Sequence, residues 1–155
     1  MKVVPALVFA SFLLSQMGTA TAEPKPATSI PAGDQMQPAD LAAILANKIA
    51  PKPLILQVGF QTLYAQAHIP DSEYVGAASE DAGLKRLHIR VAKLSKDTLI
   101  IIYCGCCPWS HCPNIAAAYD ALQGLGFSQV KALYIADNFG DDWVHRGFPV
   151  TKGHQ

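Results

Sequence analysis

The chain has 155 residues, half of them hydrophobic, and equal numbers of basic and acidic side chains, 12 of each. This balance argues against a nucleic-acid-binding protein, because binding to phosphates needs a basic patch. The length fits a single domain.

The first 22 residues have the pattern of a signal peptide. Lys2 precedes the largely apolar stretch Val3–Leu14, and Ala20-Thr21-Ala22 has the small-x-small pattern of a cleavage site. The apolar stretch is short for a membrane span. We therefore expect export, to the bacterial periplasm, with no membrane span after removal of the signal. Cysteines outside the cytosol tend to be oxidised, metal-bound or kept reduced by a dedicated partner.

Helical and strand patterns alternate along the rest of the chain. Residues 23–36, with their prolines and small polar residues, are expected to form a flexible segment before one domain at residues 37–151. Predicted helices span residues 37–48, 60–67, 81–94 and 114–125, with a helical turn at 141–145. Predicted strands span residues 54–58, 74–75, 99–103 and 129–134. The alternation predicts an α/β three-layer sandwich, with helices on both faces of a mostly parallel sheet.

All four cysteines lie within nine residues, directly after the apolar strand. They are Cys104, Cys106, Cys107 and Cys112. Cys104 would lie at the carboxyl end of the strand and near the amino end of the next helix, where the helix dipole favours an anion. The same field lowers the pKa of a thiol and increases the fraction of reactive thiolate. We therefore expect Cys104 to be a nucleophile.

The other three cysteines allow several functions. One of Cys106, Cys107 and Cys112 could resolve an intermediate on Cys104 by forming a disulfide. Cys107 and Cys112 enclose a short loop, but four cysteines permit three complete pairings. A structural disulfide that only staples the loop is a second possibility. The same thiols with His111 could bind Zn²⁺ or Cu⁺, although zinc ligands usually come from two separate segments.

Several motifs of one known family occur in order between residues 37 and 151. They are Ala67-His68-Ile69-Pro70, Tyr103-Cys104, Leu125-Gly126-Phe127 with Val130 and Leu133, and Trp143 with Gly147, Pro149 and Val150. In this order and spacing the chain resembles a rhodanese-like domain. The resemblance implies the α/β sandwich and makes Cys104 the residue that forms a persulfide.

The resemblance implies a sulfurtransferase of the thiosulfate sulfurtransferase type, or a thiol-redox enzyme, that needs no cofactor or resident metal. Expected partners are a small sulfur-containing anion or thiol acceptor and a redox protein. The substrate loop would include Gly105, Trp109, Ser110 and His111, with Trp109 as a lid or a packing residue.

The loop contains no arginine, so an anionic substrate would depend on backbone N–H groups and His111. The missing arginine argues against a phosphatase or arsenate reductase. It also keeps open an alternative function, a non-catalytic module that binds a soft metal or a redox partner.

Overall fold

The computed structural model describes residues 29–47 and 51–153. Its centre is a five-stranded sheet in the order β1-β5-β4-β2-β3, in which every neighbouring pair is parallel. The strands are β1 (Gln35–Met36), β2 (Leu54–Gln57), β3 (Glu73–Tyr74), β4 (Ile100–Tyr103) and β5 (Val130–Leu133). The predicted α/β sandwich is therefore confirmed, with β4 in the middle of the sheet.

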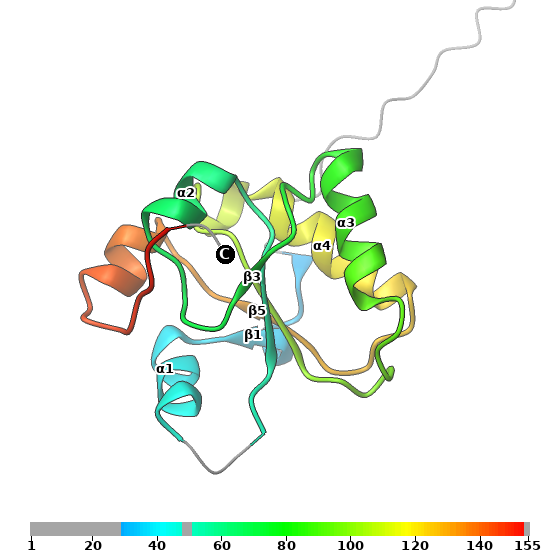
Figure 1. Cartoon of the computed structure of the whole chain (residues 1–155), viewed down its shortest axis with the longest axis horizontal. Helices are drawn as coiled ribbons and strands as arrows, with labels where there is room; N and C mark the ends of the chain where they lie inside the picture. The colour runs from blue at the N-terminus through cyan, green and yellow to red at the C-terminus, as the bar shows by residue number, and fades with distance from the viewer. Residues whose placement is uncertain (1–28, 48–50, 154–155) are drawn as a thin grey trace, which may run out of the picture.

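Helices cover both faces of this sheet, as Figure 1 shows. They are α1 (Pro38–Ala46), α2 (Gln61–Gln66), α3 (Asp81–Val91) and α4 (Pro113–Gly124), followed by a π-helical turn at Gly140–Val144. Helices α3 and α4 pack on one face, whereas α1 and the π-helical turn pack on the other. The expected helical turn near residues 141–145 is this π-helical segment.

The side chains of β4 are apolar on both faces of the sheet, so helices must pack on both faces to bury them. Ile100 and Ile102 belong to the core beneath α3 and α4, and Ile101 and Tyr103 belong to the core beneath α1. All four are buried, because successive strand residues point to opposite faces and both faces are covered. By the same alternation, Cys104 follows on the α4 side.

The N-terminal segment needs a correction. Residues 29–36 were expected to be flexible, yet within them Ile30 is buried and β1 pairs with β5. Asp34 accepts hydrogen bonds from the Tyr119 hydroxyl (2.6 Å) and the Lys131 ammonium (2.9 Å). The folded unit therefore includes this segment, because long-range contacts hold two strand residues that have no strong strand pattern of their own. The proposed signal peptide lies outside the described residues.

These contacts predict a measurable contribution to stability. The hydrogen bond from Tyr119 and the nearby Lys131 lower the pKa of the Asp34 carboxyl. Asp34→Asn should lower the free energy of unfolding by about 1 kcal/mol at pH 7, measured by urea denaturation. A lowered pKa stabilises the fold above the unfolded pKa, so the difference should vanish as the pH falls through the folded pKa. An equal loss in the exposed control Asp97→Asn would contradict this role of Asp34.

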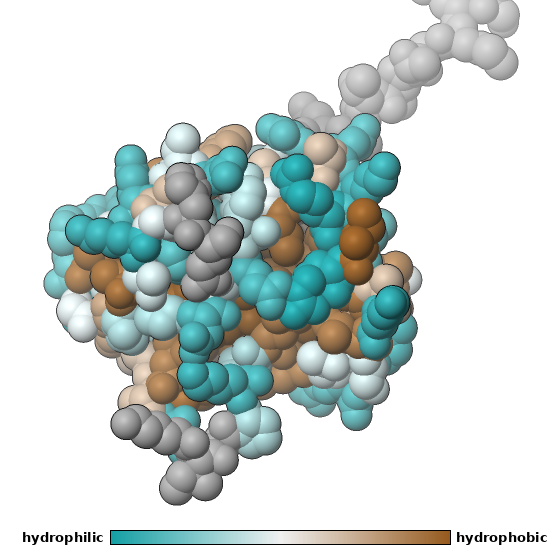
Figure 2. Space-filling model, in the orientation of Figure 1, coloured by the Kyte–Doolittle hydropathy of each residue, from teal (hydrophilic) through white to brown (hydrophobic). Residues whose placement is uncertain are grey.

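Apolar side chains are mostly inside. The large hydrophobic residues described as exposed are Phe60, Ile89, Leu125 and Val150. On the face in Figure 2, apolar residues are interrupted by hydrophilic ones. No helix among residues 29–47 and 51–153 is both long and apolar enough to span a membrane.

Candidate active site

The cysteine loop begins where the central strand ends, and a buried network fixes that strand end. The Tyr103 hydroxyl is 3.0 Å from the Ser72 hydroxyl and accepts a hydrogen bond from the Ile69 amide (3.2 Å). Residues 67–72, the His-Ile-Pro segment of the sequence, therefore anchor the last residue of β4. His68 within it is fully buried and stacks on Tyr64. This placement agrees with a structural role for His68.

Two glycines let the chain turn and pack tightly around Cys104. A Cβ atom on Gly59, just after β2, would lie 2.6 Å from the Cys104 sulfur. Gly105 has φ +74°, and a Cβ there would lie 2.6 Å from the Phe139 Cβ. A side chain at Gly59 would collide with the Cys104 sulfur, and one at Gly105 would collide with Phe139. Glycine at these positions therefore lets the chain pack directly against the sulfur and turn sharply after it.

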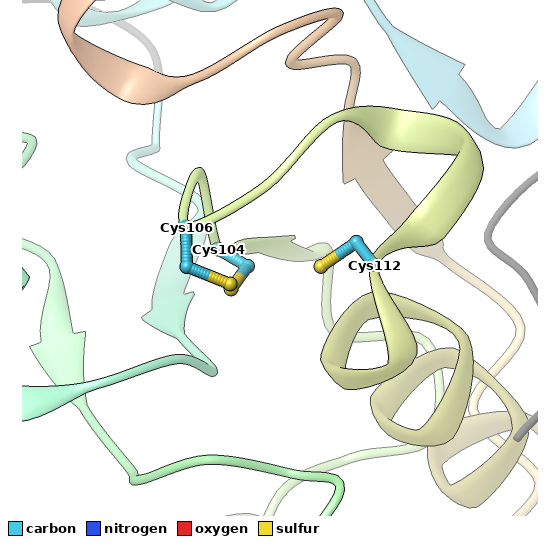
Figure 3. Close-up of side chains that lie close together, drawn as sticks. All are labelled: Cys104, Cys106 and Cys112. Atoms are coloured by element: carbon cyan, nitrogen blue, oxygen red, sulfur yellow. The ribbon is translucent and has the colours of Figure 1, made fainter.

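Three sulfur atoms converge at this turn. The Sγ atoms of Cys104, Cys106 and Cys112 all lie within 4.8 Å of one another. Cys104 and Cys106 come from the end of β4, and Cys112 points toward them from the residue that caps the start of α4 (Figure 3). Cys104 and Cys112 are buried and Cys106 is half-buried, and all four cysteines of the loop are free thiols.

Cys107 lies beside this group but outside it. Its sulfur is 3.3 Å from that of Cys106 and 3.8 Å from the backbone oxygen of His111. The sulfurs of Cys104 and Cys106 are closer to each other, at 3.1 Å, than those of Cys106 and Cys107. Among the described contacts, Cys106 is therefore the thiol best placed to resolve an intermediate on Cys104.

The hydrogen bonds among the thiols place the negative charge on Cys106. The thiol of Cys104 donates to Cys106, which raises the pKa of Cys104, and burial raises it further. Accepting from Cys104, and also from Cys112 and Cys107, lowers the pKa of Cys106. The pKa of Cys104 is thus raised rather than lowered as expected, because the hydrogen bond to Cys106 and burial both favour its thiol form.

Asn114, in the first turn of α4, supplies a further donor that the sequence analysis missed. The residue is only 1% exposed, and its Oδ1 accepts a hydrogen bond from the Ser79 backbone amide (3.0 Å). This contact turns the Nδ2 group toward the sulfurs of Cys104 (3.6 Å) and Cys106 (3.8 Å). Its place immediately after Cys112-Pro113, at a helix start, was the available signal in the sequence.

The remaining loop residues lie away from the sulfurs or in the core. Trp109 is buried against Tyr134, and its amide donates to the Ala136 oxygen, so it anchors the loop by packing rather than acting as a lid. Ser110 and His111 are exposed and hydrogen-bond to each other (2.7 Å). The donors to the sulfurs are thus the other thiols, the Asn114 side chain and the backbone N–H groups of Cys106 and Ile115, rather than a cationic His111.

Known structures have a similar fold. The rhodanese-like domain of a protein from Anabaena sp. is 21% identical with a TM-score of 0.58, and the alignment covers 77% of this chain and 79% of that domain. A rhodanese-like domain protein from Staphylococcus aureus is 14% identical with a TM-score of 0.51, over 77% of this chain and 99% of the other. The chain has the rhodanese-like fold. A protein from Bacillus halodurans is similar to the same extent, with 23% identity, a TM-score of 0.58 and 76% of each chain covered.

Comparisons of the sequence itself give no further match. No family model matches the chain. No curated protein matches it either. At these identities the structural likeness establishes the rhodanese-like fold alone.

Proposed function

We propose that this protein is an exported sulfurtransferase or thiol-redox enzyme in which Cys104 carries sulfane sulfur. The observation that supports this most is the convergence of three thiols at the carboxyl end of the central strand. Ligand and catalytic sites of parallel α/β sheets lie at that end. Within the cluster, Cys104 and Cys106 share a hydrogen bond, so a proton shift of about one bond length can move the thiolate from one sulfur to the other.

Sulfur transfer would proceed by attack of the Cys104 thiolate on the outer sulfur of a donor such as thiosulfate. A new S–S bond forms to Cys104, the S–S bond of thiosulfate breaks, and sulfite leaves with the electron pair. The product is a persulfide anion on Cys104. Hydrogen bonds from Asn114 and from the neighbouring thiols would stabilise its charge in place of an arginine.

The persulfide has two fates. A nucleophilic acceptor such as cyanide attacks the outer sulfur, forms thiocyanate and restores the Cys104 thiolate. Without an acceptor, the Cys106 thiolate attacks the inner sulfur, forms a Cys104–Cys106 disulfide and expels hydrosulfide. The two thiols are then oxidised and the sulfane sulfur is reduced, so a dithiol partner must reduce the disulfide before the next cycle. Export to the periplasm is part of this proposal and would require such a partner there.

Sulfite release tests the proposal. Reduced protein mixed with thiosulfate, with a chelator present to remove metals, should release one sulfite per chain in a rapid first turnover. Cys104→Ser should abolish this release, whereas Cys106→Ser should retain it but form no disulfide. Absence of sulfite release from the wild type with thiosulfate, and of added sulfur with other sulfane donors, would reject the transferase.

A further inference from the structure

We propose that Cys104, Cys106 and Cys112 form a binding site for one three-coordinate soft metal ion, Cu⁺. This function is independent of sulfur transfer, because it needs no sulfur donor. The sequence spacing argued against a metal because all the ligands lie on one loop. In the structure, Cys104 and Cys106 lie in the turn after β4 and Cys112 caps the start of α4, so that its sulfur approaches theirs from the opposite side (Figure 3).

The distances fit a metal bound in the plane of three sulfurs. Metal–sulfur bonds of about 2.3 Å in a trigonal arrangement put the sulfurs about 4 Å apart. The three sulfurs here are all within 4.8 Å, and the pair from the end of β4 is at 3.1 Å. Small side-chain rotations therefore suffice to bring all three into coordination.

The chemistry of the three-cysteine cluster favours Cu⁺ over Zn²⁺. Thiolates are soft ligands, which suit Cu⁺, whereas structural Zn²⁺ sites take four ligands in a tetrahedron. Cys107 is outside the group of three, and His111 is exposed. Two of the three sulfurs are buried, which leaves little access for a water as a fourth ligand.

The surroundings can hold the charge of such a complex. Binding of Cu⁺ would displace the thiol protons to solvent and leave a net negative centre. The Asn114 amide points at two of the sulfurs, and the backbone N–H of Ile115 at the start of α4 hydrogen-bonds to Cys112. Both groups donate hydrogen bonds to negatively charged sulfur, and the amino end of α4 also favours negative charge. A bound metal would occupy the Cys104 sulfur and block persulfide formation.

Anaerobic titration of the reduced full chain with Cu⁺, supplied as a complex with a coloured chelator, tests this site without any sulfur donor. The wild type should withdraw one Cu⁺ per chain from the chelator. Cys104→Ser, Cys106→Ser and Cys112→Ser should each weaken binding by at least about tenfold, as expected for loss of a ligand. Cys107→Ser, the matched control, should keep the stoichiometry and the affinity within about threefold.

Three results would overturn the proposal. They are a failure to withdraw Cu⁺ from the chelator, an equal loss of affinity in Cys107→Ser, and tighter binding of Zn²⁺ than of Cu⁺ with all four cysteines required. X-ray absorption of the wild-type Cu⁺ complex covers the case in which a serine variant does not fold. It should show three sulfurs at about 2.3 Å, and a count of two or four would contradict the site. Sulfite release is measured with metals removed, so either proposal can fail alone.

Discussion

Gly59→Ala should disable the site, because the new methyl group would collide with the Cys104 sulfur. The new Cβ would lie 2.6 Å from the Cys104 sulfur and 3.0 Å from the side-chain nitrogen Nε2 of Gln57. Neither atom has free space, because Cys104 and Gln57 are both buried. The sulfur must therefore shift, which changes its position relative to Asn114 and Cys106. We expect sulfite release to fall by at least about tenfold. The free energy of unfolding should fall by about 1–3 kcal/mol, the usual effect of overpacking.

Gly124→Ala is the matched control for this substitution. A Cβ atom on Gly124, the last residue of α4, meets no atom within 4 Å. Replacing a helical glycine with alanine is neutral or slightly stabilising. Rates of sulfite release and urea midpoints should therefore be unchanged or slightly higher. If Gly59→Ala behaved like Gly124→Ala, the close packing of the Cys104 sulfur against the turn after β2 would be contradicted.

Asn114→Asp should raise the pKa of the thiolate that Cys104 and Cys106 share, while the side chain keeps its shape. The carboxylate can still accept the Ser79 amide, but it replaces the N–H donors to the two sulfurs with a negative oxygen. Loss of a donor and gain of a like charge both disfavour the thiolate. In the wild type, the hydrogen bond from the Cys104 thiol lowers the pKa of Cys106. Alkylation of the wild type should therefore stay fast at pH values below the usual pKa range of thiols. In Asn114→Asp the pH–rate profile should move to higher pH by about one to two units.

The measurement is the rate of iodoacetamide labelling between pH 4 and pH 10, about three units on either side of neutrality. The control is Gln123→Glu, which adds the same charge at an exposed position on the same helix. Its pH–rate profile should overlie that of the wild type, because an exposed charge far along the helix is screened. An unshifted profile for Asn114→Asp would show that this amide does not stabilise the thiolate.

The main elements of the fold could be predicted because their hydrophobic spacing is strong. The Ile-rich run before Cys104 forms β4, and the alanine-rich pattern after the cysteines forms α4. The two-residue strand β1 could not be predicted, because its place depends on pairing with β5 and on the ion pair of Asp34 with Lys131. Such contacts join residues almost a hundred positions apart and leave no local pattern.

The location of the candidate site could also be predicted, but the distribution of charge within it could not. The position of Cys104 at a strand end follows from the sequence order alone. Which thiol donates and which accepts depends on the turn at Gly105 and on how Cys112 approaches from α4. Asn114 was missed for a related reason, since only the fold shows that the Ser79 amide directs its side chain toward the sulfurs.

Locating the sulfane sulfur on the chain tests most directly whether Cys104 is its carrier. Cys106→Ser is used because it lacks the thiol that would resolve the persulfide and release the sulfur as hydrosulfide. The reduced variant is treated with thiosulfate in the absence of metals, all thiols and persulfides are alkylated, and the peptides are analysed by mass spectrometry. We expect one additional sulfur atom on Cys104, and none when Cys104→Ser is added to the same variant. An additional sulfur on Cys107 or Cys112 in place of Cys104, or no addition at all, would contradict this role of Cys104.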